Sequence, residues 1–184
     1  MKYIKTKISE VVIIEPNIFG DHRGYFFESF NQNRFDNNVI KTQFVQDNES
    51  KSSKGVLRGL HFQKPPFAQA KLVRCIKGSV LDVAVDIRID SPTYGKHIAV
   101  ELSEENKRQL FVPRGFAHGF IVLSEEAIFT YKVDNVYAPD YEGGIKWDDE
   151  ELKIDWLTEK NEVKLSDKDA KLQSFKELKS LFKY

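Results

Sequence analysis

The sequence predicts an all-β fold, a sandwich or barrel of short strands, on three observations. Apolar and polar residues alternate through 78–88, which is the pattern of a strand with one buried face. Other short segments rich in Val, Ile, Phe and Tyr follow one another between turn residues. Helical spacing of apolar residues is limited to two places. Many short strands with regular turn signals are typical of a sandwich or barrel.

In chain order, strands are expected at Val11–Ile14, Gly24–Phe30, Gln43–Asn48, Val56–Phe62, Lys71–Ile76, Val80–Arg88, His97–Leu102, Gln109–Val112, Gly119–Leu123 and Ile128–Val133. The tripeptide Lys77-Gly78-Ser79 predicts a hairpin turn between the strands on either side of it. Glycine favours such a turn because it tolerates positive φ.

Helices are expected at 31–37, as one short turn, and at Lys168–Phe182. The second segment places Leu172, Phe175, Leu178, Leu181 and Phe182 on one face. Ser166 or Asp167 is expected to cap its start. The prediction is therefore one domain over residues 1–184, with a β-barrel core over about 1–140 and a C-terminal extension over about 141–184 packed back on it.

Composition excludes several classes of protein. Of 184 residues 41% are hydrophobic, including 14 Phe and 7 Tyr, which is too apolar for a disordered chain. Lys plus Arg and Asp plus Glu both number 28, and this balance argues against nucleic acid or an anionic membrane as a partner. The lone Cys75 allows no intrachain disulfide and is expected to be buried. No apolar run approaches the ~20 residues that cross a bilayer, so we expect a soluble, cytoplasmic protein.

Four polar clusters interrupt the β pattern, at 21–28, at 46–50, at 58–63 followed by Lys71, and at 113–120 followed by Tyr131 and Lys132. Arg58 and His61 differ in strand parity, and a bulge at Gly59 would bring both to one face. On pattern alone, a histidine between Leu60 and Phe62 is most often a half-buried structural residue, so both interpretations stay open. Asp82 and Asp86 are expected on a solvated or interface face, with no catalytic role.

The segment Pro113-x-Gly115-x-x-His118 matches part of the second cupin motif, which belongs to small β-barrels that often hold a metal through histidines. A metal site needs a His-x-His in the first motif, and His61-Phe62-Gln63 offers glutamine instead. We therefore predict a cupin-type β-sandwich or jelly-roll barrel, with a short C-terminal helical extension and no metal.

Six stretches match one known family, and in that family's order: DHRGYFFESF (21–30), FVQDNES (44–50), GVLRGLHFQ (55–63), AKLVRCIKGSVLDVAVDIR (70–88), NKRQLFVPRGFAHGFIVL (106–123) and YAPDYEGGIKWDD (137–149). On these stretches the sequence resembles the dTDP-4-dehydrorhamnose 3,5-epimerases, cupin-type enzymes of deoxysugar biosynthesis. The resemblance implies inversion of C3 and C5 of dTDP-4-keto-6-deoxy-D-glucose, yielding dTDP-4-keto-L-rhamnose. Protons would leave and return next to the C4 ketone, without a cofactor.

The resemblance also implies roles for four residues. His61 is the base and Tyr131 the acid, while Lys71 stabilises the oxyanion. Asp169, in the stretch 166–169, is the partner of His61, and Asp167 is close enough in sequence to remain a candidate. The residue types suit these roles, because histidine with a pKa near ~6.5 is basic at neutral pH and tyrosine with a pKa near ~10 keeps its proton.

Substrate contacts follow from the resemblance at Arg23, Glu28, Gln46, Asn48, Arg58, His118 and Glu142. Arginine suits a diphosphate because its planar fork bonds two oxygens at once. Candidates for stacking on the nucleotide base are Phe19, Phe26 and Tyr137. The family is dimeric with exchanged strands, so Arg23 and Phe26 are expected to serve the neighbouring subunit's site.

Alternatives remain open at this point. Asp140 stands where many family members have Glu, and Gly143-Gly144 replaces bulkier residues, so a single-centre epimerase or another nucleotide sugar is the second hypothesis. A metal-dependent cupin enzyme and a catalytically silent sugar-binding barrel belong to other classes. The joint presence of His61, Lys71 and Tyr131 argues against the silent barrel. The absence of a glycine-rich phosphate loop argues against a nicotinamide or ATP cofactor.

Overall fold

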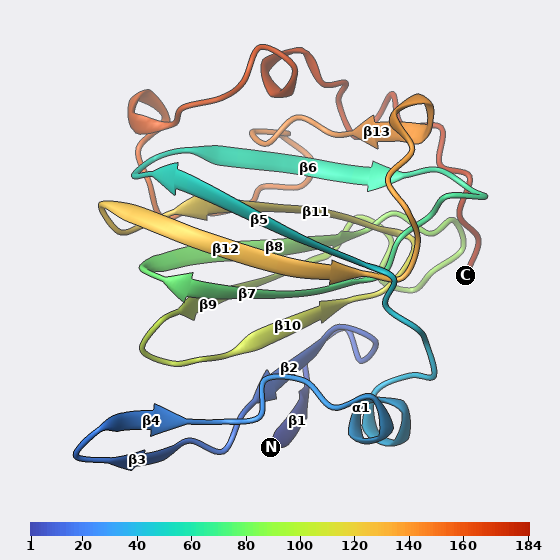
Figure 1. Ribbon diagram of the computed structural model, residues 1–184. Coiled ribbons are helices and arrows are strands. Elements are labelled where there is room, and N and C mark those ends of the chain that lie inside the picture. The colour runs from blue at the N-terminus through green and yellow to red at the C-terminus, as the bar shows by residue number, and fades with distance from the viewer.

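The computed structural model describes residues 1–184, and two facing sheets make up most of it (Figure 1). One contains β1 (Lys2–Lys5), β2 (Val12–Glu15), β5 (Gln46–Ser53), β7 (Lys71–Lys77), β10 (Gln109–Val112) and β12 (Glu126–Val133). The other contains β6 (Leu57–Gln63), β8 (Ser79–Asp86), β9 (His97–Ser103), β11 (Phe116–Val122) and β13 (Glu142–Gly144). The hairpin of β3 (Phe19–Asp21) and β4 (Gly24–Phe26) lies apart from both. The predicted all-β class is confirmed.

Neighbouring strands are antiparallel throughout. The six-stranded sheet has the order β1-β2-β10-β7-β12-β5, and the five-stranded sheet has the order β13-β6-β11-β8-β9. Apolar side chains from the two inner faces interdigitate, as between Val73 and Phe129 of one sheet and Ala84 and Phe120 of the other. The rings of Phe120 and Phe129 stack with centroids 4.1 Å apart. Cys75 belongs to this core and is buried, as predicted.

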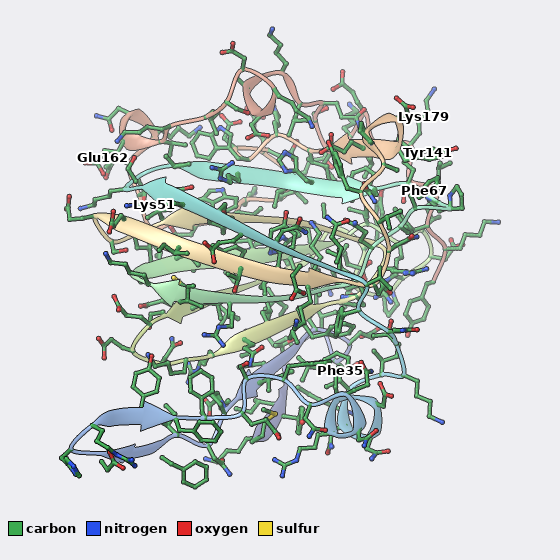
Figure 2. All side chains as sticks on the ribbon, in the orientation of Figure 1. Phe35, Lys51, Phe67, Tyr141, Glu162 and Lys179 are labelled. Carbon is green, nitrogen blue, oxygen red and sulfur yellow. The ribbon has the colours of Figure 1, made fainter.

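Helix α1 (Gln32–Asn38) covers the outer face of the six-stranded sheet, close to the predicted 31–37. Asn31 caps it, because its side-chain oxygen accepts a hydrogen bond from the Arg34 amide. The buried Phe35 packs edge-on against Phe111 of β10 (Figure 2). Three 3-10 turns complete the helical content, at Pro139–Tyr141, Lys160–Glu162 and Asp169–Lys171. None of these helices has the length and apolar content needed to cross a lipid bilayer.

The C-terminal helix predicted over Lys168–Phe182 does not form. Beyond the 3-10 turn at 169–171 the chain is irregular, with one further turn at 175–177, and it crosses the outer face of the five-stranded sheet (Figure 1). Phe175 and Phe182 are buried there. The backbone of this part of the chain bonds to other segments: the amide of Lys146 donates to the Gln173 carbonyl at 2.9 Å, and that of Ile89 to the Phe182 carbonyl at 2.8 Å. Partners outside the segment therefore replace the helical bonds, and packing overrides the helical spacing.

The hairpin predicted at Gly78 is also wrong. A tight turn is present, with Gly78 at a φ of 72°, but β7 pairs with β10 and β12 while β8 pairs with β9 and β11. The turn therefore takes the chain from one sheet to the other. Glycine is needed here because a Cβ would lie 2.1 Å from the Glu126 carbonyl oxygen. Sequence alternation identified both strands but contains no information on which partners they choose.

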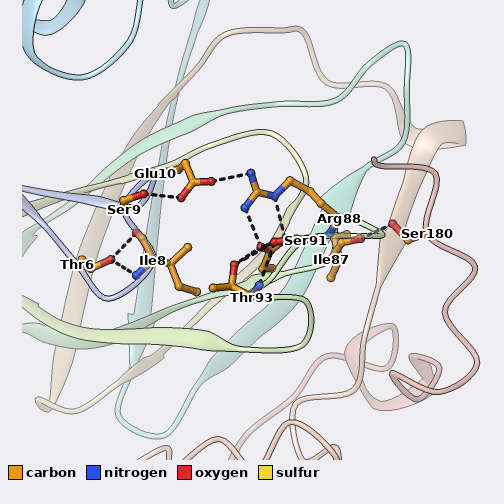
Figure 3. A network of polar contacts seen from close by, with 10 residues as sticks. Thr6, Ile8, Ser9, Glu10, Ile87, Arg88, Ser91, Thr93 and Ser180 are labelled. Carbon is orange, nitrogen blue, oxygen red and sulfur yellow. Dashed lines mark hydrogen bonds and ion pairs between the residues drawn. The ribbon is translucent and has the colours of Figure 1, made fainter. Parts of the chain in front are cut away.

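A polar network connects the segment between β1 and β2 with the segment that follows β8 (Figure 3). Arg88 donates to both carboxylate oxygens of Asp86, at 2.9 and 2.7 Å, and pairs with Glu10 at 3.0 Å. Ser91 and Thr93 each donate to Asp86, both at 2.6 Å. Asp86 is fully buried within the chain, contrary to the predicted solvated or interface face. Its charge is compensated by these donors, which lie in the segment that joins β8 to β9.

Candidate active site

Two adjoining cavities lie between the sheets and share His61, Lys71 and Tyr131. The larger, of about 450 Å³, also contains Arg58, His118 and Asp169 in its wall. The smaller, of about 310 Å³, adds Gln46, Asn48, Tyr137 and Glu142. Most of the residues predicted for the site are therefore brought together around one continuous space.

His61 and Asp169 form a closely bonded pair at the wall of this space. The Nε2 atom of His61 lies 2.5 Å from Oδ1 of Asp169, whose side chain is 5% exposed. Ser166 fixes the carboxylate, because its hydroxyl donates to Oδ2 at 2.9 Å and accepts from the Asp169 amide at 3.1 Å. Burial works to raise the pKa of Asp169, yet the hydrogen bond with His61 holds it below its ordinary value. The structure brings Asp169 to the histidine and leaves Asp167 exposed.

A bulge in β6 explains how Arg58 and His61 reach the same cavity. His118 pairs with His61 and Phe120 pairs with Arg58, so two steps along β11 correspond to three along β6. The extra residue restores a common face. Gly59 has a φ of 135°, and a Cβ there would lie 2.5 Å from the Gly119 Cα. The break predicted at Gly59 is thus confirmed.

Lys71 and Tyr131 enter the cavity from the six-stranded sheet, opposite His61. The Lys71 ammonium lies 5.9 Å from the Tyr131 ring centroid. Burial lowers the pKa of Lys71 to about 8, although the charges of Asp82 and Glu142 oppose this change. Burial raises the pKa of Tyr131, so the phenol keeps its proton at neutral pH. An ammonium and a phenol thus face a carboxylate-bound imidazole across the cavity.

His118 is bonded to a carboxylate that the sequence prediction set aside. Its Nε2 atom lies 3.0 and 2.9 Å from the two oxygens of Asp82, and the side chains are 7% and 0% exposed. Asp82 was expected on a solvated or interface face, and this is wrong. The parity that places Val80 and Ala84 in the core between the sheets also places Asp82 there. This strand parity was the signal in the sequence that could have predicted the burial of Asp82.

Glu142 lines the smaller cavity and is held by two donors. Its Oε2 atom accepts from the Lys168 ammonium and, at 3.0 Å, from the Tyr137 hydroxyl. Burial works to raise the pKa of Glu142, but these two donors hold it below its ordinary value. Lys168, which the prediction did not single out, therefore adds a positive charge beside His61 and Asp169.

Polar residues of β5 line the smaller cavity. Gln46 donates to the Asn48 side-chain oxygen at 2.8 Å, and the Tyr137 amide donates to Gln46 at 3.2 Å. Arg58, on the neighbouring wall, donates through Nε to Ser52 at 3.2 Å. These contacts leave the outer edge of the Arg58 guanidinium free for an anion.

Four predicted residues lie away from the cavity. Arg23 is on the β3–β4 hairpin, paired with Asp21 at 2.6 Å, and its side chain is 78% exposed. Phe19 and Phe26 of the same hairpin are 65% and 71% exposed. Glu28 pairs with Arg34 at 3.3 Å on α1. Within one chain these residues contact none of the cavity walls, and the hairpin projects from the sandwich (Figure 1).

No group of three His, Cys, Asp or Glu side chains lies close enough together to form a metal site. His61 and His118 are cross-strand partners, and each is bonded to its own carboxylate. A neutral imidazole backed by a carboxylate can accept a proton from carbon, and a phenol across the space can return one. A buried ammonium beside the phenol can stabilise the oxyanion that forms between these two proton transfers.

Comparison with known proteins agrees with this chemistry. The family model described as dTDP-4-dehydrorhamnose 3,5-epimerase matches residues 5–177. The chain is 58% identical over 176 residues to the dTDP-4-dehydrorhamnose 3,5-epimerase of Shigella flexneri, covering 95% of this chain and 96% of that protein.

Among solved structures, a dTDP-6-deoxy-D-glucose-3,5-epimerase of Legionella pneumophila Philadelphia 1, in complex with dTDP-4-keto-L-rhamnose, superposes with a TM-score of 0.96. It is 49% identical, and the match covers 100% of this chain and 98% of that chain. ChmJ of Streptomyces bikiniensis, a 3′-monoepimerase in complex with dTDP-quinovose, superposes with a TM-score of 0.86 at 32% identity, covering 92% and 86%. These neighbours confirm the predicted cupin-type jelly-roll fold.

Proposed function

The chain belongs to the dTDP-4-dehydrorhamnose 3,5-epimerase family and is an isomerase that inverts C3 and C5 of dTDP-4-keto-6-deoxy-D-glucose, and we propose that His61 and Tyr131 transfer the protons. The observation that carries this assignment is the placement of the two groups on facing sheets. A sugar ring between the sheets presents one face to each. Inversion requires a base on one face and an acid on the other, and this arrangement supplies both.

The reaction begins at a carbon next to the C4 ketone, which acidifies the hydrogens on C3 and C5. His61 takes a proton through Nδ1, because Nε2 faces Asp169, and the carboxylate stabilises the imidazolium that forms. The electron pair moves onto O4, where the Lys71 ammonium stabilises the oxyanion. Tyr131 then donates its proton to the carbon from the opposite face, and the inverted ketone results.

The diphosphate and nucleoside are held by the remaining residues of the site. Arg58 and Lys168 provide positive charge at the wall of the larger cavity. Gln46, Asn48 and Glu142 line the continuation of this space and provide hydrogen bonds to the nucleotide. His118 contacts the sugar. The relatives solved with dTDP-4-keto-L-rhamnose and with dTDP-quinovose support a nucleoside diphosphate sugar as the substrate.

Arg23 and Glu28, with the aromatic residues of the β3–β4 hairpin, reach a cavity only from a second subunit in this proposal. The exposed hairpin and its distance from the cavity of its own chain support a homodimer with exchanged strands. In mixtures of Arg23→Ala and His61→Ala chains, heterodimers would contain one intact site, restoring roughly a quarter of all sites. No recovery on mixing would contradict this exchange.

Product analysis tests the function itself. The enzyme is incubated with dTDP-4-keto-6-deoxy-D-glucose, the ketone is reduced with borohydride, and the sugar is identified by chromatography. Rhamnose among the products is expected, whereas a sugar inverted at one carbon only would favour the monoepimerase alternative raised by ChmJ. The His61→Ala variant should lose turnover while KM barely changes.

Elemental analysis of the purified enzyme tests the metal-dependent alternative, since we propose that neither metal nor cofactor takes part. Because the substrate is a nucleotide sugar, we place the reaction in the cytoplasm.

A further inference from the structure

Asp82 is a charged residue in the core between the sheets. It lies on the inner face of β8, with Val80 and Ala84 on either side of it, and is completely buried. Its hydrogen bonds all go to one group, the His118 imidazole, at 3.0 and 2.9 Å. A buried carboxylate loses several kcal/mol of hydration free energy that one hydrogen bond recovers only in part. Packing alone therefore favours an apolar residue at this position.

The contact fixes which nitrogen of His118 holds the proton. Both carboxylate oxygens face Nε2, so Nε2 must donate. Burial lowers the pKa of His118, which leaves the ring neutral at pH 7 with a single proton. Nδ1 is then a bare acceptor. It has no hydrogen-bond partner within the chain, and the ring lines the larger cavity, where a sugar hydroxyl can donate to it.

Asp82 also contributes charge to the surroundings of Lys71. Asp82 does not line the cavity itself but is bonded to the His118 ring, which shares the cavity wall with Lys71. The titratable groups that line the two cavities around this ammonium are Glu49, Arg58, His61, His118, Tyr131, Tyr137, Glu142, Lys164, Lys168 and Asp169. Burial lowers the pKa of Lys71 to about 8, and the charges of Asp82 and Glu142 oppose that change. Glu142 is already paired with Lys168. Of these two carboxylates, Asp82 is the one whose charge no lysine or arginine neutralises.

We propose that Asp82 is a positioning residue for the epimerisation, which acts through two neighbours. It orients the His118 ring so that Nδ1 accepts a hydroxyl of the sugar, and it supplies negative charge that keeps Lys71 an ammonium. The proposal rests on the function given above, because the oxyanion is what Lys71 must stabilise. Asp82 itself does not touch the substrate.

The test compares the pH dependence of kcat/KM in two variants. Asp82→Asn keeps the size of the side chain and an oxygen acceptor for His118 but removes the charge. Loss of a nearby opposite charge moves a pKa by about one unit or more, so the alkaline limb should move down by about one pH unit. Starting from a Lys71 pKa of about 8, the fraction of ammonium at pH 8 then falls about fivefold, and kcat/KM with it.

Asp86→Asn is the matched control, since Asp86 is an equally buried carboxylate on the same face of β8 but bonds to Arg88 outside the cavity. It should lower thermal stability and leave the alkaline limb where it is in the parent enzyme. An unchanged limb in folded Asp82→Asn would overturn the role in maintaining the charge of Lys71. An alkaline limb displaced equally in both variants would overturn the claim that Asp82, and not any buried carboxylate of β8, maintains the charge of Lys71.

Nitrogen NMR of the parent enzyme, labelled with ¹⁵N in its histidines, tests which ring nitrogen of His118 holds the proton. This measurement needs no substitution at position 82. The chain has 4 histidines, and a His118→Gln variant identifies the signal of interest. The proposal requires a protonated Nε2 and an unprotonated Nδ1 at pH 7, and the opposite tautomer would refute it. This result does not depend on turnover. Failure of the proposed function would instead appear as an absence of inverted product in the parent enzyme.

Discussion

Replacing Asp169 with asparagine isolates the contribution of the carboxylate behind His61. The variant keeps the volume of the side chain and can still accept a hydrogen bond, but it no longer offers a negative charge to the imidazolium. At the observed N···O distance of 2.5 Å and an effective dielectric constant of ~20, Coulomb's law gives ~7 kcal/mol for the charged pair. This is an upper limit, because water reaches the His61 side chain, which is 27% exposed.

The corresponding substitution of asparagine for aspartate in a Ser-His-Asp triad lowers kcat about 10⁴-fold. We therefore expect kcat to fall by about 10²–10⁴ with little change in KM, measured by steady-state kinetics on the keto sugar nucleotide. Asp167→Asn is the control, since Asp167 lies two residues away but is exposed and makes no hydrogen bond to His61. A kcat in Asp169→Asn within a few-fold of the parent, or an equal loss in Asp167→Asn, would refute the reasoning.

Further predictions follow from the acid, the ammonium, the bulge and the polar network. Tyr131→Phe should still exchange a substrate proton with solvent but form little inverted product, and full product formation would contradict its role as acid. The parent kcat/KM should decline above about pH 8, where Lys71 loses its proton, and Lys71→Arg should abolish that decline while lowering the rate. Gly59→Ala should lower the free energy of unfolding by about 3 kcal/mol in denaturant titrations, because its φ is positive and its Cβ meets backbone. Burial works to raise the pKa of Asp86, but its hydrogen bonds, led by those from Arg88, hold the pKa below its ordinary value. The ionised Asp86 carboxylate should therefore stabilise the fold fully above about pH 4, and this contribution should be lost at lower pH. Asp86→Asn should weaken this pH dependence of the free energy of unfolding.

Local alternation predicted the strands, whereas the site residues were predicted from the resemblance of short motifs to one family. The segment 109–112 was placed at its observed bounds, and the parity conflict between Arg58 and His61 correctly pointed to a break at Gly59. The strand expected over 24–30 was too long, since β4 ends at Phe26, and β1, β3 and β13 were missed. These short strands have too few residues to establish a pattern.

Long-range packing accounts for the other errors. The apolar spacing in 168–182 fits a helix, but those side chains instead cover the five-stranded sheet from an irregular backbone that bonds to Lys146 and Ile89. Asp82 was assigned to the wrong environment because polar residues in a strand usually face solvent. Only the opposing sheet and His118 make its burial tolerable, and neither is adjacent to it in sequence.

The most direct test of the double inversion is proton NMR of dTDP-4-keto-6-deoxy-D-glucose incubated with the enzyme in deuterium oxide. Each inversion by this route removes a carbon-bound proton, and the base or acid that returns one will have exchanged with the solvent. The account predicts that the C3 and C5 proton signals both disappear while the L-sugar product accumulates. Loss of one signal alone would mean a single-centre epimerase, and retention of both in the presence of active product formation would contradict the proton-transfer mechanism.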